Sequence, residues 1–344
     1  MDDTLTDRQL PAVKHLYQNH SFDALRWNFF RKRDDDIIIA TSYKAGTTWM
    51  QGIVANLIFG GQRPAEPMQQ LSPWVDFRVF PLELVLTGLE QQKHRRFIKT
   101  HLPLDGLPFD RTLKYIYVGR DARDVFMSFW NHYRGFTDAA FALLNTTPGR
   151  VGPELPRCPE NIHQLWRDWT TRGSFEWETE GYPWWSNLHN VQSWWDFRHL
   201  PNILFVHYAD LLADLEGEIR RVAHFLEIEV PDRAWGAIVQ NSTFTEMRAF
   251  EEKNDERLRM AFKDGARTFF HKGTNGRWRE ILSPEELGLY DAAAKRELTL
   301  GCRQWLENGG RPMTVSTGRG RPFLGHTCWT DIYAGSPRAS TPPT

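Results

Sequence analysis

Residues 37–49 read IIIATSYKAGTTW, and this stretch decides the fold. A short apolar run at residues 37–39 leads into a polar loop, and residues 49–58 then follow the pattern of an amphipathic helix. A strand, a tight loop and a helix in this order bring backbone N–H groups and a helix N-terminus around one point, which suits an anion such as phosphate. The loop also carries a lysine and two hydroxyl groups. We therefore expect an anion site at Lys44, Ala45, Gly46, Thr47 and Thr48.

Other parts of the chain alternate between strand and helix patterns. Further strands are predicted at residues 96–99, 114–118 and 203–208. Helices are predicted from residue 123 onward and at residues 187–197, 215–226 and 284–306. Residues 62–96 are rich in loop-forming residues, and residues 135–185 read as irregular and aromatic. The alternation predicts an α/β fold: a single domain with a central, mostly parallel sheet flanked by helices.

The chain divides into three regions by composition. Residues 1–36 read as a lead-in that is part of the domain, with residues 34–36 as a solvated acidic turn, and residues 37–306 carry the domain itself. Residues 309–344 are rich in Gly, Pro, Ser, Thr and Arg, which predicts a disordered tail.

Charge and composition exclude several classes of function. The formal net charge is -1 over 344 residues, so no global basic field favours nucleic acid or an anionic membrane. We expect no membrane span, because no run of about 18 apolar residues occurs. The start of the chain lacks a secretory signal, and the three cysteines fit no zinc or redox motif. These features favour a cytoplasmic protein.

A second polar segment follows the predicted strand at residues 96–99 and reads KTHLP. Ligands of open α/β sheets bind at the carboxyl ends of the strands. A histidine at this place, His101, can act as a general base, because its ordinary pKa lies near 6.5. The neighbouring Lys99 can bind an anionic oxygen.

Two later segments offer a second phosphate site. Residues 117–128 read YVGRDARDVFMS, which places Arg120 at a strand end and Ser128 within the helix that follows. The planar guanidinium group of arginine binds phosphate well because it can donate two parallel hydrogen bonds. Residues 269–278 read FFHKGTNGRW, a glycine-containing turn with His271, Lys272 and Gly273.

These four segments, in this order, resemble the cytosolic PAPS-dependent sulfotransferases, where PAPS is 3′-phosphoadenosine 5′-phosphosulfate. The family patterns are TYPKSGTTW, KTHLP, YVxRxxxDVxxS and FxRKGxxGDW. The first loop is not a Walker loop, since Lys44 precedes Gly46 instead of following the second glycine. The resemblance covers residues 37 to about 280.

The resemblance implies a role for each segment. His101 would be the catalytic base, Lys44 would stabilise the leaving oxygen, and Lys99 would hold the sulfuryl group. Residues 44–48 would bind the 5′-phosphate, with Thr47 and Thr48 as hydroxyl ligands. The 3′-phosphate would be bound by Arg120, Ser128, His271, Lys272 and Gly273. The adenine would be contacted by Trp49, Tyr208, Ser242 and Phe244. PAPS is the implied donor and PAP the product, and no metal is needed.

The resemblance also has gaps. His271 stands where the family has arginine, and Arg277 replaces an aspartate. The animal dimer motif KxxxTVxxxE is absent from residues 279–285, so the oligomeric state stays open. The acceptor pocket is predicted to be lined by Trp74, Phe77, Phe80, Phe129 and His132. Aromatic walls suit a small aromatic or hydrophobic acceptor. The group that receives the sulfate is expected to be a hydroxyl, with an amine as the second choice.

Two other functions remain open from the sequence. One is a small-molecule kinase, which would require a Walker lysine and a magnesium-binding acid. The other is a catalytically weak PAP-binding or scaffold protein of the same fold, which the change at His271 makes worth testing.

Overall fold

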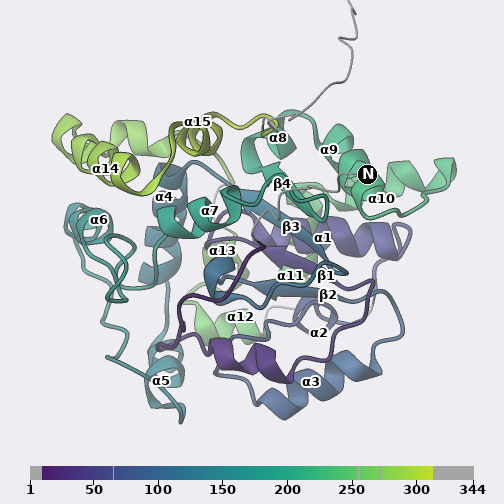
Figure 1. Cartoon of the computed structure of the whole chain (residues 1–344). Helices are drawn as coiled ribbons and strands as arrows, with labels where there is room; N and C mark the ends of the chain where they lie inside the picture. Colours follow the sequence, from purple (N-terminus) through teal and green to yellow (C-terminus); the bar gives the residue numbers. More distant parts are fainter. Residues whose placement is uncertain (1–9, 65, 254–255, 271–272, 313–344) are drawn as a thin grey trace, which may run out of the picture. The chain divides into compact units, whose positions relative to one another are not determined.

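The computed structural model describes residues 10–64, 66–253, 256–270 and 273–312 (Figure 1). Most of the predicted tail lies outside this part of the chain, as do His271 and Lys272.

The four predicted strands form one parallel sheet. They are β1 (Ile37–Ala40), β2 (Phe97–Thr100), β3 (Lys114–Gly119) and β4 (Ile203–His207), in the order β2-β1-β3-β4. Ile39 of β1 is in register with Lys99 of β2, and Ala40 with Tyr117 of β3. Because all strands run in one direction, the loops after β1, β2 and β3 leave the sheet at the same edge. The predicted α/β fold is confirmed.

The helices predicted next to the strands are present, with small shifts at their ends. They are α1 (Thr47–Ile58), α4 (Ala122–Arg134), α7 (Leu188–Trp195) and α9 (Leu215–Phe225). The strand predicted at 203–208 ends one residue early, because His207 caps α8 (Tyr208–Ala213) by accepting a hydrogen bond from Ala209 N at Nδ1, 3.2 Å away.

Three regions were predicted wrongly. The helix expected at 284–306 is two helices, α14 (Pro284–Glu297) and α15 (Leu300–Asn308), because the intervening Leu298 and Thr299 are extended. The region 135–185 contains α5 (Asp138–Thr146) and α6 (Ile162–Thr171), and the region 62–96 contains α2 (Met68–Leu71) and α3 (Leu82–Gln91). The other helical segments are η1 (Ala24–Phe29), η2 (Leu104–Gly106), η3 (Asp232–Ala234), α10 (Trp235–Asn241), α11 (Phe244–Lys253), α12 (Glu256–Ala261), α13 (Ala266–Phe269) and η4 (Arg277–Glu280).

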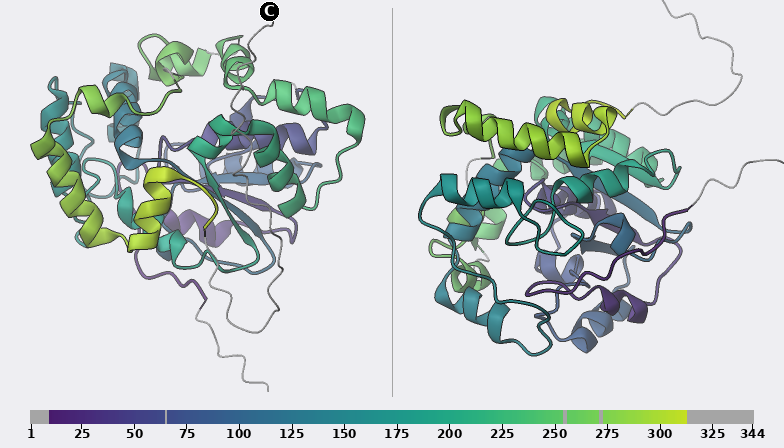
Figure 2. Two further views of the ribbon diagram at one scale, coloured as in Figure 1. Left: turned by 90° about the horizontal axis from the view of Figure 1, so that it is seen from above. Right: turned by 60° about the vertical axis from the view of Figure 1, so that its left-hand side comes forward.

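The sheet separates two hydrophobic cores, and Figure 2 shows helices packed on both of its faces. Side chains of β1 alternate between the cores: Ile38 packs into one, and Ile37 and Ile39 into the other. The first core is rich in tryptophan and tyrosine and includes α4, α6 and α7. The second is mainly aliphatic and joins α1 to α9.

The acidic turn at residues 34–36 is partly wrong as well. Asp36 is fully buried and makes a two-pronged ion pair with the equally buried Arg96, with distances of 2.7 and 2.5 Å. The backbone of Arg96 also accepts a hydrogen bond from Ile37 N. Asp36 therefore fixes the start of β1 against β2, whereas Asp34 and Asp35 are exposed.

Candidate active site

The loop after β1 has a backbone that only particular residues adopt easily. Gly46 caps α1 with a φ of 116°, and Lys44 has a φ of 50°. A Cβ atom at Gly46 would lie 3.0 Å from the ring of Tyr208. The glycine thus leaves the N-terminus of α1 open, as a phosphate site requires. Thr47 is buried, and Thr48 is half-buried at the same helix end.

His101 lies directly after β2 and is held in one tautomer. Its Nδ1 lies 3.0 Å from the carbonyl oxygen of Thr41, which can accept a hydrogen bond but cannot donate one. Nδ1 therefore carries the proton in the neutral ring, and Nε2 has a free lone pair. Burial, with the charge of Lys99, places the pKa of His101 well below its ordinary value. His101 is consequently a neutral imidazole.

Two lysines lie at the same edge of the sheet. Burial, helped by the positive charges of Lys99 and Arg120, lowers the pKa of Lys44 to about 7. Burial likewise lowers the pKa of Lys99 to about 8, against the opposing charge of Asp76. The amine of Lys44 donates to Nδ1 of His132 at 3.0 Å, and the amine of Lys99 lies 4.5 Å from the ring of Trp74.

Arg120 connects three segments of the predicted donor site. Its guanidinium donates to Lys44 O at 3.3 Å, to Thr274 O at 3.0 Å and to Asn275 Oδ1 at 3.0 Å. It also lies 4.2 Å from the ring of Tyr208. The first loop, the end of β3 and the 273–276 turn therefore meet at this arginine.

The residues predicted to contact adenine form a connected group. Trp49 donates to Ser242 O at 2.7 Å, and its ring meets Tyr208 edge-on at 5.1 Å. Tyr208 donates to Gly273 O at 3.1 Å. Gly273 has a φ of 64°, and a Cβ there would meet the ring of Phe244 at 3.0 Å. Ser242 joins this group through its backbone carbonyl, because its buried hydroxyl accepts a hydrogen bond from Asn56 Nδ2 at 3.0 Å.

The predicted acceptor residues lie in three different places. Trp74 meets His101 edge-on at 4.8 Å and stacks on Phe77 at 4.4 Å, which in turn meets the exposed Phe80 at 5.3 Å. His132 joins Lys44 instead. Phe129 is fully buried against Tyr43, Tyr133 and Trp184 and is a core residue. Ser128 is half-buried on α4, and within the described residues its hydroxyl has no hydrogen-bond partner.

Several supporting residues were missed by the sequence analysis. Thr41 bonds His101 and, through its hydroxyl, Thr47 at 2.7 Å. Asn190 donates to His101 O at 2.9 Å. Trp185 and Asn187 bond to Ser42 at 3.0 and 2.6 Å. The polar residues within the aromatic stretch at residues 184–195 were a possible signal for these anchors.

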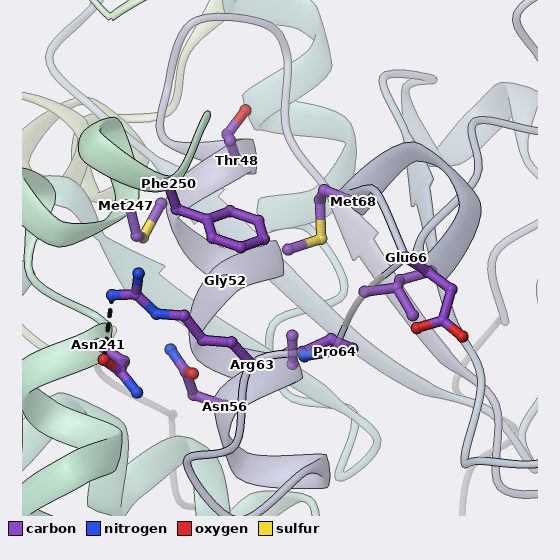
Figure 3. A pocket seen from close by; sticks show the side chains of 12 residues that line it. Thr48, Gly52, Asn56, Arg63, Pro64, Glu66, Met68, Asn241, Met247 and Phe250 are labelled. Atoms are coloured by element: carbon purple, nitrogen blue, oxygen red, sulfur yellow. Dashed lines mark hydrogen bonds between the residues drawn. The ribbon is translucent and has the colours of Figure 1, made fainter. Parts of the chain in front are cut away.

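A separate pocket lies between α1, α11 and the 63–71 segment (Figure 3). Its lining is mainly apolar, and Arg63 reaches across it to Asn241 Oδ1 at 3.0 Å and Glu246 Oε2 at 2.7 Å. Thr48 belongs both to this pocket and to the predicted donor residues, whereas Lys44, His101 and Arg120 do not line it. The pocket is therefore next to the predicted active site and not part of its centre.

A membrane-crossing helix would have to be long and apolar, and none of the helices in the described part of the chain meets that requirement.

Comparisons with known proteins agree with this geometry. The family model for the sulfotransferase domain matches residues 34–301. A glycolipid sulfotransferase from Mycobacterium bovis is 33% identical over 285 residues, which cover 79% of this chain and 87% of the relative. Sulfotransferase 1A1 from Rattus norvegicus is 28% identical over 77% of this chain and 85% of its own length. A mouse sulfotransferase, SULT7A1, solved in complex with PAP, has a similar fold, with a TM-score of 0.59 and 22% identity over 79% of this chain and 87% of that one. The chain therefore belongs to the sulfotransferase family.

Proposed function

We propose that the acceptor is a small aromatic or hydrophobic compound whose hydroxyl group receives the sulfuryl group at His101. The observation that carries this proposal is the tautomer of His101. Because Thr41 O accepts the Nδ1 proton, Nε2 is the nitrogen that can take a proton from a hydroxyl. The lowered pKa keeps this nitrogen unprotonated at neutral pH.

In this mechanism Nε2 takes the hydroxyl proton while the acceptor oxygen forms a bond to sulfur. The bond from sulfur to the bridging oxygen of PAPS breaks in line, and its electron pair stays on the 5′-phosphate of PAP. Lys44 would donate to the bridging oxygen as charge develops there, and Lys99 to the sulfuryl oxygens. The positive charges of the two lysines and the N-terminus of α1 are sufficient without a metal.

The donor would be held at both of its phosphates. The open helix end at Gly46, where a side chain would collide with Tyr208, supports the assignment of the 5′-phosphate to residues 44–48. The convergence of Arg120 with the turn after Gly273 supports a 3′-phosphate site there, with Ser128 from α4 as a further ligand. The group formed by Trp49, Tyr208 and Phe244 supports the assignment of adenine.

A series of aromatic rings supports a hydrophobic acceptor. It runs from His101 through Trp74 and Phe77 to Phe80, which is 40% exposed. A hydroxyl at His101 would leave the rest of the acceptor against these rings. The name of the mycobacterial relative, glycolipid sulfotransferase, agrees with an acceptor that has a large apolar part.

The test is sulfate transfer from PAPS to a panel of phenols, sterols, glycolipids and simple carbohydrates. We expect transfer to phenols or other apolar hydroxyl compounds, and its loss in His101→Ala with PAP affinity retained. Normal turnover in His101→Ala would refute the base assignment. PAP binding without transfer to any acceptor would favour the PAP-binding scaffold, and a thermal shift with ATP and magnesium but not with PAP would favour a kinase.

A further inference from the structure

The neighbour of Lys44 is a second histidine in the active site. His132 lies on α4, one helix turn after Ser128, and its Nδ1 is 3.0 Å from the amine of Lys44. A lysine ammonium group has no lone pair and can only donate, so Nδ1 of His132 is the acceptor. His132 is thus held in the tautomer opposite to that of His101, with its proton on Nε2.

His132 is well suited to remain neutral and fixed. Its ring contacts those of Phe262, Phe136, Trp184 and Phe269, with centroids 4.6 to 5.7 Å apart. Burial and the charges of Lys44, Lys99 and His101 keep its pKa well below the ordinary value. A neutral imidazole packed among rings is a hydrogen-bond acceptor that neither rotates freely nor repels the lysine.

Lys44 needs such an acceptor. Its amine faces two other cations, Lys99 and Arg120, which disfavour its charge, and its side chain is long and flexible. The ring of Phe269, 4.8 Å from the amine, supports the charge but offers no lone pair. A hydrogen bond from a charged donor to a fixed acceptor favours the charged form and restricts its position.

We propose that His132 is a positioning residue that favours the charged form of Lys44 and leaves two of the three N–H bonds of its ammonium group for the phosphosulfate of the donor. This inference rests on the proposed assignment of Lys44 to the donor. It assigns His132 to the donor half of the site and removes it from the acceptor wall.

The test compares His132→Asn with His132→Leu, two side chains of the same branching. Asparagine offers an acceptor oxygen close to the place of Nδ1, whereas leucine offers none. PAP affinity is measured by calorimetry between pH 6 and 8.5, an experiment that needs no sulfate-accepting substrate. The control for disturbance of α4 is Tyr133→Phe. Tyr133 is the next residue on the same helix, and this substitution removes its hydrogen bond to Pro156 O.

In the leucine variant Lys44 has no hydrogen-bond acceptor at position 132. Its pKa should therefore fall by about one, the effect expected of one charge-assisted hydrogen bond. Affinity in the leucine variant should therefore be about tenfold weaker near pH 8 and should approach the wild-type value near pH 6. The asparagine and Tyr133→Phe variants should follow the wild-type profile.

Two results would overturn the inference: a loss that is the same at every pH, or equal losses in the asparagine and leucine variants. Failure of the wild-type protein to bind PAP would instead contradict the proposed donor site itself, so the two failures are distinguishable.

Discussion

Asn190 holds the backbone of His101 at the end of β2. Its Nδ2 donates to His101 O at 2.9 Å, and its Oδ1 accepts a hydrogen bond from Tyr117 OH, also at 2.9 Å. All three residues are buried, and Asn190 comes from α7, 89 residues after the histidine. The position of the proposed base is therefore fixed by a helix on one face of the sheet.

Replacing Asn190 with leucine should impair turnover more than donor binding. The substitution leaves the carbonyl of His101 and the hydroxyl of Tyr117 without their partner, which costs about 1–3 kcal/mol of unfolding free energy for such a buried group. We expect kcat to fall about tenfold or more and the Kd for PAP to stay within about twofold, because a displaced base loses its alignment. Gln192→Ala, on the same helix, serves as the control. An unchanged kcat in a folded Asn190→Leu protein would contradict the positioning role.

Gly46→Ala tests the backbone of the phosphate loop. The substitution places a side chain at a φ of 116° and brings its Cβ to 3.0 Å from the ring of Tyr208. We expect PAP affinity to fall at least about tenfold, with fold content by circular dichroism unchanged. Gly236→Ala is the matched control, because a Cβ there meets nothing within 4 Å. Wild-type PAP affinity in Gly46→Ala would show that the helix end does not bind the donor.

Asp36→Ala should be among the most destabilising single changes at the base of the sheet. It leaves the buried guanidinium of Arg96 without its charge partner, and breaking a buried pair in this way costs about 3–5 kcal/mol. Urea unfolding of Asp36→Ala and of Asp35→Ala, the exposed neighbour, gives the comparison. A loss of similar size in both variants would mean that the pair contributes little.

The features that could be predicted from the sequence are those that depend on residues close together in the chain. Apolar runs, glycines and the residues directly after each strand are close in sequence, so β1 to β4 and the positions of Lys44, Lys99, His101 and Arg120 could be predicted. The contact of Lys44 with His132 could not, because it joins residues 88 positions apart and depends on how α4 packs.

Partners such as Asn190 and Thr41 were missed for the same reason. Asparagine and threonine are common polar residues, and nothing local distinguishes one that bonds the proposed base from one that faces water. The break between α14 and α15 was missed because the apolar pattern continues across Leu298, although the backbone there is extended.

Glu178 and Glu180 are buried carboxyl groups that hold the segment leading into α7. Glu178 accepts hydrogen bonds from the backbone N–H groups of Ser174, Phe175 and Ser186. Glu180 accepts from the hydroxyl of Ser186 and from the backbone N–H groups of Asn187 and Leu188. The same segment carries Trp185 and Asn187, which bond to Ser42 before the phosphate loop. The charge state of these two carboxyl groups therefore bears on the stability of the site.

The contribution of this pair to stability should fall as the pH rises through its pKa values. Burial raises the pKa of Glu178 to about 8 and that of Glu180 to about 7, from an ordinary value of 4.5. Because the folded state binds these protons more tightly than the unfolded chain, their contribution is complete below pH 4.5 and is lost as the pH rises through 7 and 8. The lowered pKa values of Lys44 and Lys99 act in the opposite direction over the same range, so the variants are compared with the wild type. We expect the Tm of Glu178→Gln and of Glu180→Gln to rise relative to that of the wild type between pH 5.5 and 8.5. Glu176→Gln, an exposed neighbour, should keep the wild-type slope. Equal slopes in all four proteins would show that the two carboxyl groups titrate normally and that another group causes any loss at high pH.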